Sequence, residues 1–276
     1  MGIVIYHNPC MDGFTAAWVA SKFNPKPTDQ YIPAKYGDPV PNVESQDVLI
    51  VDYSYPRDVM EEMYEKAKSL VVLDHHKSAE QNCKGLDFCQ FDMNRSGAGM
   101  AWDFLFPDQP RPALVNYVED RDLWRFSLPG SRAATAYISS FARTIDNWDL
   151  LANDLENHFN YVVVPQGGAI LRFEEQKVRE IATEARERFV PYKPNEGYNI
   201  LSCNCPYQFA SEVGEYLYTQ NPERPFVATY FDRGDGKQQW SLRSASSGLD
   251  VSEVAKEYGG GGHAHAAGFV LGEVTR

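Results

Sequence analysis

Short apolar runs alternate with amphipathic stretches over residues 2–126. The apolar runs are rich in Val, Ile and Leu, and the stretches between them repeat apolar positions with helical spacing. Strands that are buried on both faces read as continuous apolar runs, and helices connect such strands when they are parallel. The pattern therefore predicts a mostly parallel sheet with helices on both faces. The expected elements are strands at 3–6, 47–52 and 70–74 and helices at 13–23 and 56–69.

The pattern changes in the second half of the chain. Residues 131–165 favour helices, and residues 169–188 form a charged amphipathic stretch that we interpret as a connector, with a surface helix of the first domain as the alternative. Further strands are expected at 197–203, 225–231 and 238–243, followed by a helix at 251–258. A chain of 276 residues is long enough for two domains. We expect an N-terminal α/β domain over 1–165, a helical connector over 166–192 and a smaller mixed α/β domain over 193–276.

Composition narrows the class of protein. Hydrophobic residues make up 43% and charged residues 23% of the chain, which is typical of a globular protein. The net charge of −12 argues against a surface that tracks long nucleic acid, because lysine and arginine supply most of that affinity. A small anionic substrate is still compatible with this charge if positive charge, including that of metal ions, is concentrated in a pocket.

Two further features bear on location. No apolar run approaches the roughly 18 residues of a membrane helix, and the chain starts without the pattern of a secretion signal, so no membrane partner is expected. The 5 cysteines are an odd number and fit a reducing compartment better than a disulfide framework. Cys203 and Cys205 lack a second pair at zinc-site spacing and are interpreted as structural. We expect a cytoplasmic protein.

Polar residues follow each of the predicted N-terminal strands. Because the carboxyl ends of parallel strands meet at one edge of a sheet, we expect these side chains to converge. Each has an ordinary explanation when taken alone, since an aspartate at a strand end often caps the next helix. The residues are His7 and Asp12 after the first strand, Asp52 after the second, and Asp74, His75 and His76 after the third.

Carboxylates that converge at one edge repel each other unless positive charge lies among them. Divalent metal ions supply that charge, and mixed oxygen and imidazole ligands suit Mn²⁺, Fe²⁺, Co²⁺ or Zn²⁺ better than Mg²⁺. Two such ions can hold a phosphoryl group and activate water. We expect two divalent ions, with Mn²⁺ as the first expectation and iron, cobalt or zinc as alternatives.

A fourth acidic segment follows a helix that is expected to begin near Pro112. Asp120 or Asp122 in this segment could complete the ligands of the second metal ion. The spacing is equally compatible with a salt-bridge cluster that involves Arg121 and Arg125. Both interpretations stay open at this stage.

The strand-end segments and the acidic segment after Pro112, taken in chain order, resemble the motifs of the Asp-His-His (DHH) phosphoesterase superfamily. The glycine-rich segment at residues 259–269 resembles its DHH-associated domain. The resemblance covers nearly the whole chain and implies metal-dependent phosphodiester hydrolysis. The residues that carry it are 7–13, Asp52, 74–76, 119–126 and 259–269.

The resemblance also implies roles for individual residues. His7 and Asp52 would bind one metal ion, and Asp12, Asp52 and His75 would bind the other, so that Asp52 bridges them. His76 would act at the phosphate or the nucleophile, and Asp74 would orient the imidazoles, as carboxylates commonly do for ligand histidines.

One position departs from the family pattern. The usual first motif has two aspartates, whereas this chain has only Asp12 there, with Cys10 near the place of the other. A Cys10 thiolate would favour a softer ion such as Fe²⁺, Co²⁺ or Zn²⁺. The alternatives are a weakly held first ion and a cysteine that only packs.

The C-terminal domain is expected to bind the far end of the substrate. The resemblance points to a substrate-facing arginine, and glycines allow close approach of backbone N–H groups to phosphate oxygens. Tyr53, Tyr55 and Trp124 are candidates for stacking on a base, with core packing favoured for Trp124. The candidate substrate-binding residues are Arg243, Ser244, Gly260, Gly261, Gly262 and His263, with Lys77, Arg95 and Ser96 as weaker ones.

We predict an enzyme that hydrolyses short oligoribonucleotides or linear dinucleotides to mononucleotides. A 3'-phosphoadenosine 5'-phosphate phosphatase is the second choice. A catalytically impaired, nucleotide-binding regulatory protein is the alternative from another class. The expected partner is a short RNA or small nucleotide and not long nucleic acid, and a homodimer is left open.

Overall fold

The chain divides into two compact units, Met1–Leu171 and Arg172–Arg276. This computed structural model describes residues 2–23, 25–193, 196–245 and 248–272. The predicted limits at 165, 166–192 and 193 remain predictions, and residues 194–195 and 273–276 of the expected C-terminal domain lie outside the described residues. Within the described ranges, no helix combines the length and apolar character that crossing a bilayer requires.

The N-terminal unit contains a five-stranded parallel sheet in the order β2-β1-β3-β4-β5. The predicted fold class is confirmed here, with three strands at the expected positions. β2 and β5 were not expected: β5 is short, and β2 contains Pro33, which an edge strand tolerates because one side of its ladder is unpaired. The strands are β1 (Ile3–His7), β2 (Gln30–Ala34), β3 (Asp47–Val51), β4 (Ser69–Asp74) and β5 (Cys89–Phe91).

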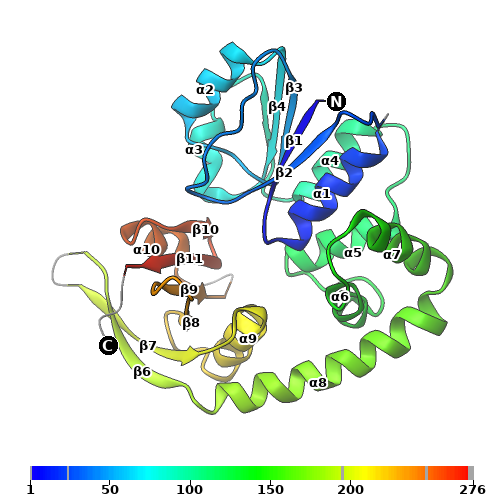
Figure 1. Ribbon diagram of the computed structural model, residues 1–276. Coiled ribbons are helices and arrows are strands. Elements are labelled where there is room, and N and C mark those ends of the chain that lie inside the picture. Colours follow the sequence, from blue (N-terminus) through cyan, green and yellow to red (C-terminus); the bar gives the residue numbers. More distant parts are fainter. Residues whose placement is uncertain (1, 24, 194–195, 246–247, 273–276) are drawn as a thin grey trace. The chain divides into compact units, whose positions relative to one another are not determined.

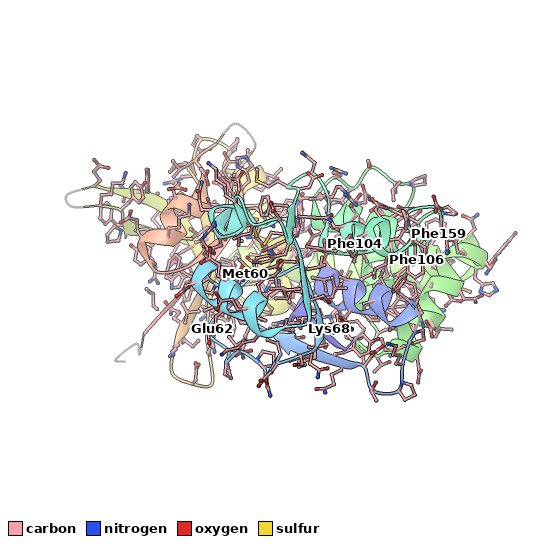
Figure 2. The ribbon with its side chains drawn as sticks, turned by 90° about the horizontal axis from the view of Figure 1, so that it is seen from above. Met60, Glu62, Lys68, Phe104, Phe106 and Phe159 are labelled. Atoms are coloured by element: carbon pink, nitrogen blue, oxygen red, sulfur yellow. The ribbon has the colours of Figure 1, made fainter. Side chains whose placement is uncertain are left out.

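Helices cover both faces of this sheet (Figure 1). Successive residues of β3 alternate between the two cores, so that Leu49 packs with α1 and α4, and Ile50 packs with α2 and α3. On α2, Met60 is buried and Glu62 is exposed to solvent (Figure 2). These helices are α1 (Met11–Lys22), α2 (Arg57–Lys66), α3 (Glu80–Cys83) and α4 (Gly97–Leu105).

The rest of the N-terminal unit is helical, as predicted for residues 131–165. A helix was also expected over 169–188, but α8 ends at Ala182 and a strand, β6 (Arg186–Pro191), follows. The charged composition favours a helix locally, whereas pairing of β6 with β7 satisfies its backbone groups in the sheet. The helices are α5 (Ala113–Asp122), α6 (Ser131–Ser139), α7 (Ile145–Asn157), a π-helical turn (Phe159–Val163) and α8 (Val164–Ala182).

The C-terminal unit contains a six-stranded mixed sheet in the order β10-β11-β9-β8-β7-β6, which confirms the predicted mixed α/β class. Only the β7–β8 pair is parallel among its described strand pairs. Helix α9 was not predicted, and it packs on the core cluster that contains Cys203 and Cys205, both buried. The elements are β7 (Gly197–Asn204), α9 (Ala210–Gln220), β8 (Val227–Asp232), β9 (Gln238–Arg243), α10 (Val251–Glu257), β10 (Gly261–His263) and β11 (Ala266–Leu271).

Candidate metal centre

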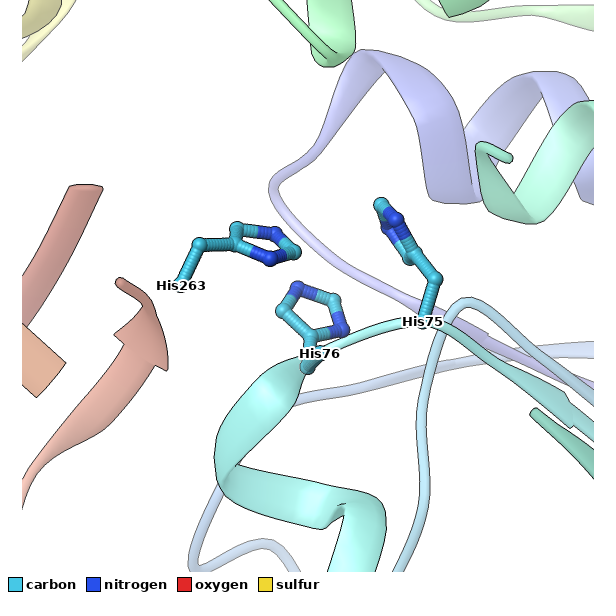
Figure 3. Close-up of side chains that lie close together, drawn as sticks. All are labelled: His75, His76 and His263. Atoms are coloured by element: carbon cyan, nitrogen blue, oxygen red, sulfur yellow. The ribbon is translucent and has the colours of Figure 1, made fainter. Parts of the chain in front are cut away.

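The N-terminal sheet brings acidic and imidazole groups together at the carboxyl edge of its strands. β1 ends at His7 and β4 at Asp74, and Asp52 directly follows β3. The imidazoles of His75 and His76 come next after β4, with ring centroids 4.8 Å apart (Figure 3). The convergence follows from the parallel order of the strands, which puts their ends side by side.

Asp52 lies between two imidazoles. Its Oδ1 is 3.0 Å from His75 Nε2, and its Oδ2 is 3.4 Å from His7 Nδ1. The side chain is buried, and the backbone φ of 55° is in the left-handed region, where aspartate is one of the tolerated residues. Space for this carboxylate depends on glycines: a Cβ on Gly97 would lie 2.5 Å from Asp52 Cβ, and one on Gly13 would lie 3.0 Å from Asp52 Oδ2.

Asp12 is held by the N-terminus of a second helix. It is buried in the first turn of α1, and its oxygens accept hydrogen bonds from the backbone N–H groups of Gly97, at 2.6 Å, and Ala98, at 3.0 Å, where α4 begins. Oδ2 of Asp12 lies 3.7 Å from His75 Nε2. Helix N-termini favour a carboxylate in this position, so α4 fixes the orientation of Asp12.

Asp74 fixes His76. Its Oδ1 accepts from His76 Nδ1 at 2.8 Å and from the backbone N–H groups of His75, at 2.7 Å, and His76, at 3.2 Å. The imidazole of His76 is therefore oriented by a carboxylate. At His75 the same carboxylate accepts from the backbone N–H group. The expected role of Asp74 in orienting an imidazole therefore applies directly to His76.

The electrostatics of the cluster are unbalanced. Burial, together with the charges of Asp122 and Asp52, raises the pKa of Asp12 well above its ordinary value, and burial raises the pKa of Asp122. Burial also acts against ionisation of Asp52, but the neighbouring imidazoles of His7 and His75 outweigh it and hold the pKa of Asp52 well below its ordinary value. For His75, burial is outweighed by the bond with Asp52, so its pKa is raised. The imidazoles supply positive charge beside the crowded carboxylates.

The residues present fit divalent metal ions. Several groups of side chains among the described residues place their ligand atoms within 4.8 Å of one another. They include His7, Cys10 and Asp52, then Asp12, His75 and Asp122, and also Asp52, Asp74 and His76. Oδ2 of Asp52 and Oδ2 of Asp122 are buried and accept no hydrogen bond from the residues described. Buried carboxylate oxygens without a donor are costly unless a cation or water satisfies them. The mixed oxygen, nitrogen and sulfur donors suit a transition metal.

Asp120 and Asp122 lie in different surroundings. Asp122, the last residue of α5, places Oδ2 3.6 Å from His75 Nε2. Asp120 instead accepts hydrogen bonds from the backbone N–H of Ser127, at 2.9 Å, the Oγ of the same residue and that of Ser131. Of the two expected candidates, Asp122 therefore joins the cluster and Asp120 stabilises the segment after α5. The alternative of a salt-bridge cluster does not describe Asp120.

Cys10 precedes α1 and is half-buried beside His7 and Asp52. Burial, followed by the charge of Asp52, raises the pKa of the Cys10 thiol well above its ordinary value. In these surroundings the thiol keeps its proton unless a metal ion displaces it, because bound cations deprotonate coordinating thiols.

Several expected substrate-binding residues have structural partners instead. Ser96 is buried and caps α4 by accepting from Gly99 N, so it is not exposed to a ligand. Arg95 forms an ion pair with Asp103. Tyr53 and Tyr55 are buried and pack edge to face with each other, with centroids 4.9 Å apart, so neither ring can stack on a base. Sequence alone does not show that Ser96, Tyr53 and Tyr55 are buried. Arg95 is partly exposed, and its role in binding substrate stays a prediction.

The C-terminal candidates are held by their own unit. Arg243 donates to Leu242 O and to Ser211 Oγ, both at 2.8 Å, and Ser244 Oγ donates to Leu249 O. Gly261, Gly262 and His263 form strand β10. A Cβ on Gly260 would lie 2.1 Å from Gly268 O. Glycine at position 260 therefore lets the backbone of β11 pass close by, which is a packing role.

Sequence reasoning missed two kinds of contributor to the cluster. The backbone N–H groups of Gly97 and Ala98 hold Asp12, and the exposed ring of Tyr36 lies 6.1 Å from that of His7. The first had a signal, because Ser96 before a run of small residues is a helix start. The second had none, since Tyr36 lies in a segment without a hydrophobic pattern.

The chain is similar to known proteins in sequence and in fold. A DHHA1 domain matches residues 210–275. An uncharacterized protein, R106, of Acanthamoeba polyphaga mimivirus is 27% identical over 98% of this chain and 67% of its own length. Oligoribonuclease NrnB of Bacillus subtilis is 26% identical over 71% of this chain, but the match covers only 51% of NrnB.

Among solved structures, a DHH domain from a member of a family of ribosomal proteins superposes with a TM-score of 0.56, over 97% of this chain and 82% of that one. At 15% identity this likeness concerns the fold alone. The DHHA1 match, the oligoribonuclease relative and the DHH-domain fold agree with one another. Residues 210–275 therefore contain a DHHA1 domain, and the chain is similar in sequence to an oligoribonuclease and in fold to a DHH domain.

Proposed function

We propose that this protein is a metal-dependent phosphodiesterase that hydrolyses short oligoribonucleotides or linear dinucleotides to mononucleotides. The observation that carries the proposal is the position of Asp52, whose two oxygens face His75 on one side and His7 on the other. A carboxylate shared in this way is what a two-metal phosphoryl site requires. The relation to an oligoribonuclease, over about half of that protein's length, supports the substrate class.

Two of the groups of ligand atoms support our choice of metal ligands. His7, Cys10 and Asp52 would hold one ion, and Asp12, His75 and Asp122 would hold the other, with Asp52 shared. Bound divalent ions supply positive charge for the phosphate oxygens and lower the pKa of water. Asp120, which bonds elsewhere, is not proposed as a ligand.

The chain's own side chains orient the reacting groups. Asp74 binds Nδ1 of His76, so Nε2 is the atom through which this ring would donate to a phosphate oxygen or accept a proton. The N-terminus of α4 fixes Asp12 through two backbone N–H groups, which keeps this carboxylate from turning away from the cluster. In the C-terminal unit, Arg243, Ser244, His263 and the glycines before it remain the proposed substrate-binding residues.

The test uses metal-stripped protein reconstituted separately with Mn²⁺, Co²⁺, Zn²⁺, Fe²⁺ and Mg²⁺. Substrates are RNAs of two, three and five nucleotides and 3'-phosphoadenosine 5'-phosphate, and release of mononucleotides is followed by chromatography. We expect the dinucleotide to be cleaved fastest and the stripped protein to be inactive. Binding of nucleotides without cleavage under every metal would instead support the regulatory alternative.

A matched control keeps the test specific. Asp52→Asn should abolish cleavage. Asp47→Asn changes the aspartate at the other end of β3, which is exposed and bonded to Ser69 and Lys68, and should leave cleavage unchanged.

A further inference from the structure

An exposed tyrosine lies beside the candidate metal centre. Tyr36 is 58% exposed as a residue, and the centroid of its ring is 6.1 Å from that of the His7 imidazole. Single exposed aromatic residues are common on protein surfaces, so exposure alone does not mark a ligand site. Tyr36 differs from the other exposed aromatic residues in its place beside His7, one of the candidate metal ligands. The position of this ring therefore points to a ligand that uses its face.

The backbone holds Tyr36 at the edge of the sheet where the cluster lies. β2 ends at Ala34, which is paired with His7 in the parallel ladder, and Asn8 N donates to Ala34 O. The next residues form a turn closed by a bond from Asp38 N to Lys35 O at 3.0 Å. Gly37 has a φ of 93°, which favours glycine at this point of a turn. The tyrosine is presented at the tip of that turn.

The side chain of Tyr53 also supports the ring of Tyr36. The buried ring of Tyr53 lies 5.2 Å from that of Tyr36, and the Tyr53 hydroxyl donates to Lys35 O at 3.3 Å, which ties the turn to the core. A stacking surface that is already in place loses little conformational entropy when a base binds it. Aromatic side chains are the usual platforms for bases of single-stranded nucleic acids.

We infer that Tyr36 is the stacking platform for the nucleobase next to the phosphodiester that is cleaved. The inference rests on the proposed function, because it places the scissile phosphate at the cluster that contains His7. It adds that the substrate at this position carries a base, which separates short RNAs and dinucleotides from base-free phosphates. Stacking does not read the identity of a base, so little preference among the four bases is expected here.

The experiment compares pApA with two versions in which one ribose lacks its base. For the wild type with Mn²⁺, we expect kcat/KM to fall roughly 10- to 100-fold for one of the abasic versions, as loss of one base stack predicts. Tyr36→Ala should cleave pApA and that abasic version equally slowly, whereas Tyr36→Phe and Tyr36→Trp should keep the preference. A base preference that survives unchanged in Tyr36→Ala would overturn the inference.

Controls separate this inference from the proposed function and from misfolding. Tyr64→Ala removes another exposed tyrosine, 54% exposed and stacked on Phe88, and should keep the base preference. Thermal unfolding of Tyr36→Ala checks its fold. If no dinucleotide is cleaved by the wild type, the proposed function fails, but the same comparison in binding affinity with Mn²⁺ still tests the stack. Equal affinity of the wild type for pApA and both abasic versions would then reject it.

Discussion

Two clusters of charged side chains lie in the N-terminal unit, and they differ in balance. In the first, Arg95 and Arg111 pair with Asp103, and Arg111 also pairs with Glu119 at 2.8 Å, so that each charge has an opposite partner. Glu119 in turn accepts from Ser96 N and so supports the start of α4. The charges of this cluster balance without any ligand, and the cluster supports the start of α4.

The second cluster, the candidate metal centre, has more carboxylates than positively charged partners. Asp12, Asp52 and Asp122 crowd around His75, and buried oxygens of Asp52 and Asp122 accept no hydrogen bond from the described residues. Burying like charges together costs folding free energy unless a ligand offsets the repulsion. The comparison teaches that the number of charged residues does not mark a functional site, whereas an excess of one sign among buried groups does.

The largest effect is expected from the shared carboxylate. Asp52→Asn keeps the volume of the side chain but removes the charge between His7 and His75, so kcat/KM for a dinucleotide should fall at least about a thousandfold, or roughly 4 kcal/mol of transition-state stabilisation. Steady-state assays at saturating Mn²⁺ measure this loss, and circular dichroism checks the fold. Retention of more than a tenth of the wild-type rate would contradict the role given to Asp52.

Metal removal should separate the two clusters by stability. Mn²⁺ at about 100 times its Kd should stabilise the wild type by about 2.7 kcal/mol relative to the chelated protein. Urea unfolding with and without a chelator measures this increment. Asp103→Asn, in the balanced cluster, should keep the increment and Asp52→Asn should lose most of it. An equal increment in both variants would mean that the metal binds elsewhere.

Asp120 and Asp122 offer the sharpest test within one helix. Asp122→Asn relieves a carboxylate whose pKa is raised by burial, so the metal-free protein should be stabilised, on the order of 1 kcal/mol, while activity falls. Asp120→Asn loses bonds from Ser127 and Ser131 and should be destabilised by roughly 1–3 kcal/mol with Mn²⁺ affinity retained. Isothermal titration with Mn²⁺ and urea unfolding distinguish the two. The reverse pattern would show that the assignments are exchanged.

The same pair shows what sequence could and could not predict. Val, Ile and Leu runs identify buried parallel strands, and the strand ends then bring His7, Asp52 and His75 together without any knowledge of contacts. Residues two apart on a helix point about 200° apart, so only the packing of α5 decides that Asp122 faces the cluster. The local pattern at residues 186–188 predicts a helix instead of the observed strand, because the pairing of this segment with β7 is a tertiary contact.

The smallest predicted effect lies in the balanced cluster and depends on pH. The hydrogen bond from Arg111 lowers the pKa of Asp103, so the ionised carboxylate stabilises the fold above its unfolded pKa, near 4, and that stability is lost as the pH falls through the folded pKa. The side chain is 41% exposed, and solvent screening limits the contribution to about 1 kcal/mol or less.

Asp103→Asn should therefore be less stable than the wild type at pH 7 and nearly equal to it at pH 2. Urea unfolding of chelated protein at both pH values measures the difference, and Asp108→Asn, an exposed aspartate in the segment between α4 and α5, serves as the control with no difference at either pH. A difference that stays constant with pH would show that Asp103 acts through packing and not through its charge. The balanced cluster would then offer no electrostatic counterpart to the metal centre, and an excess of one sign would lose its value as the mark of the functional site.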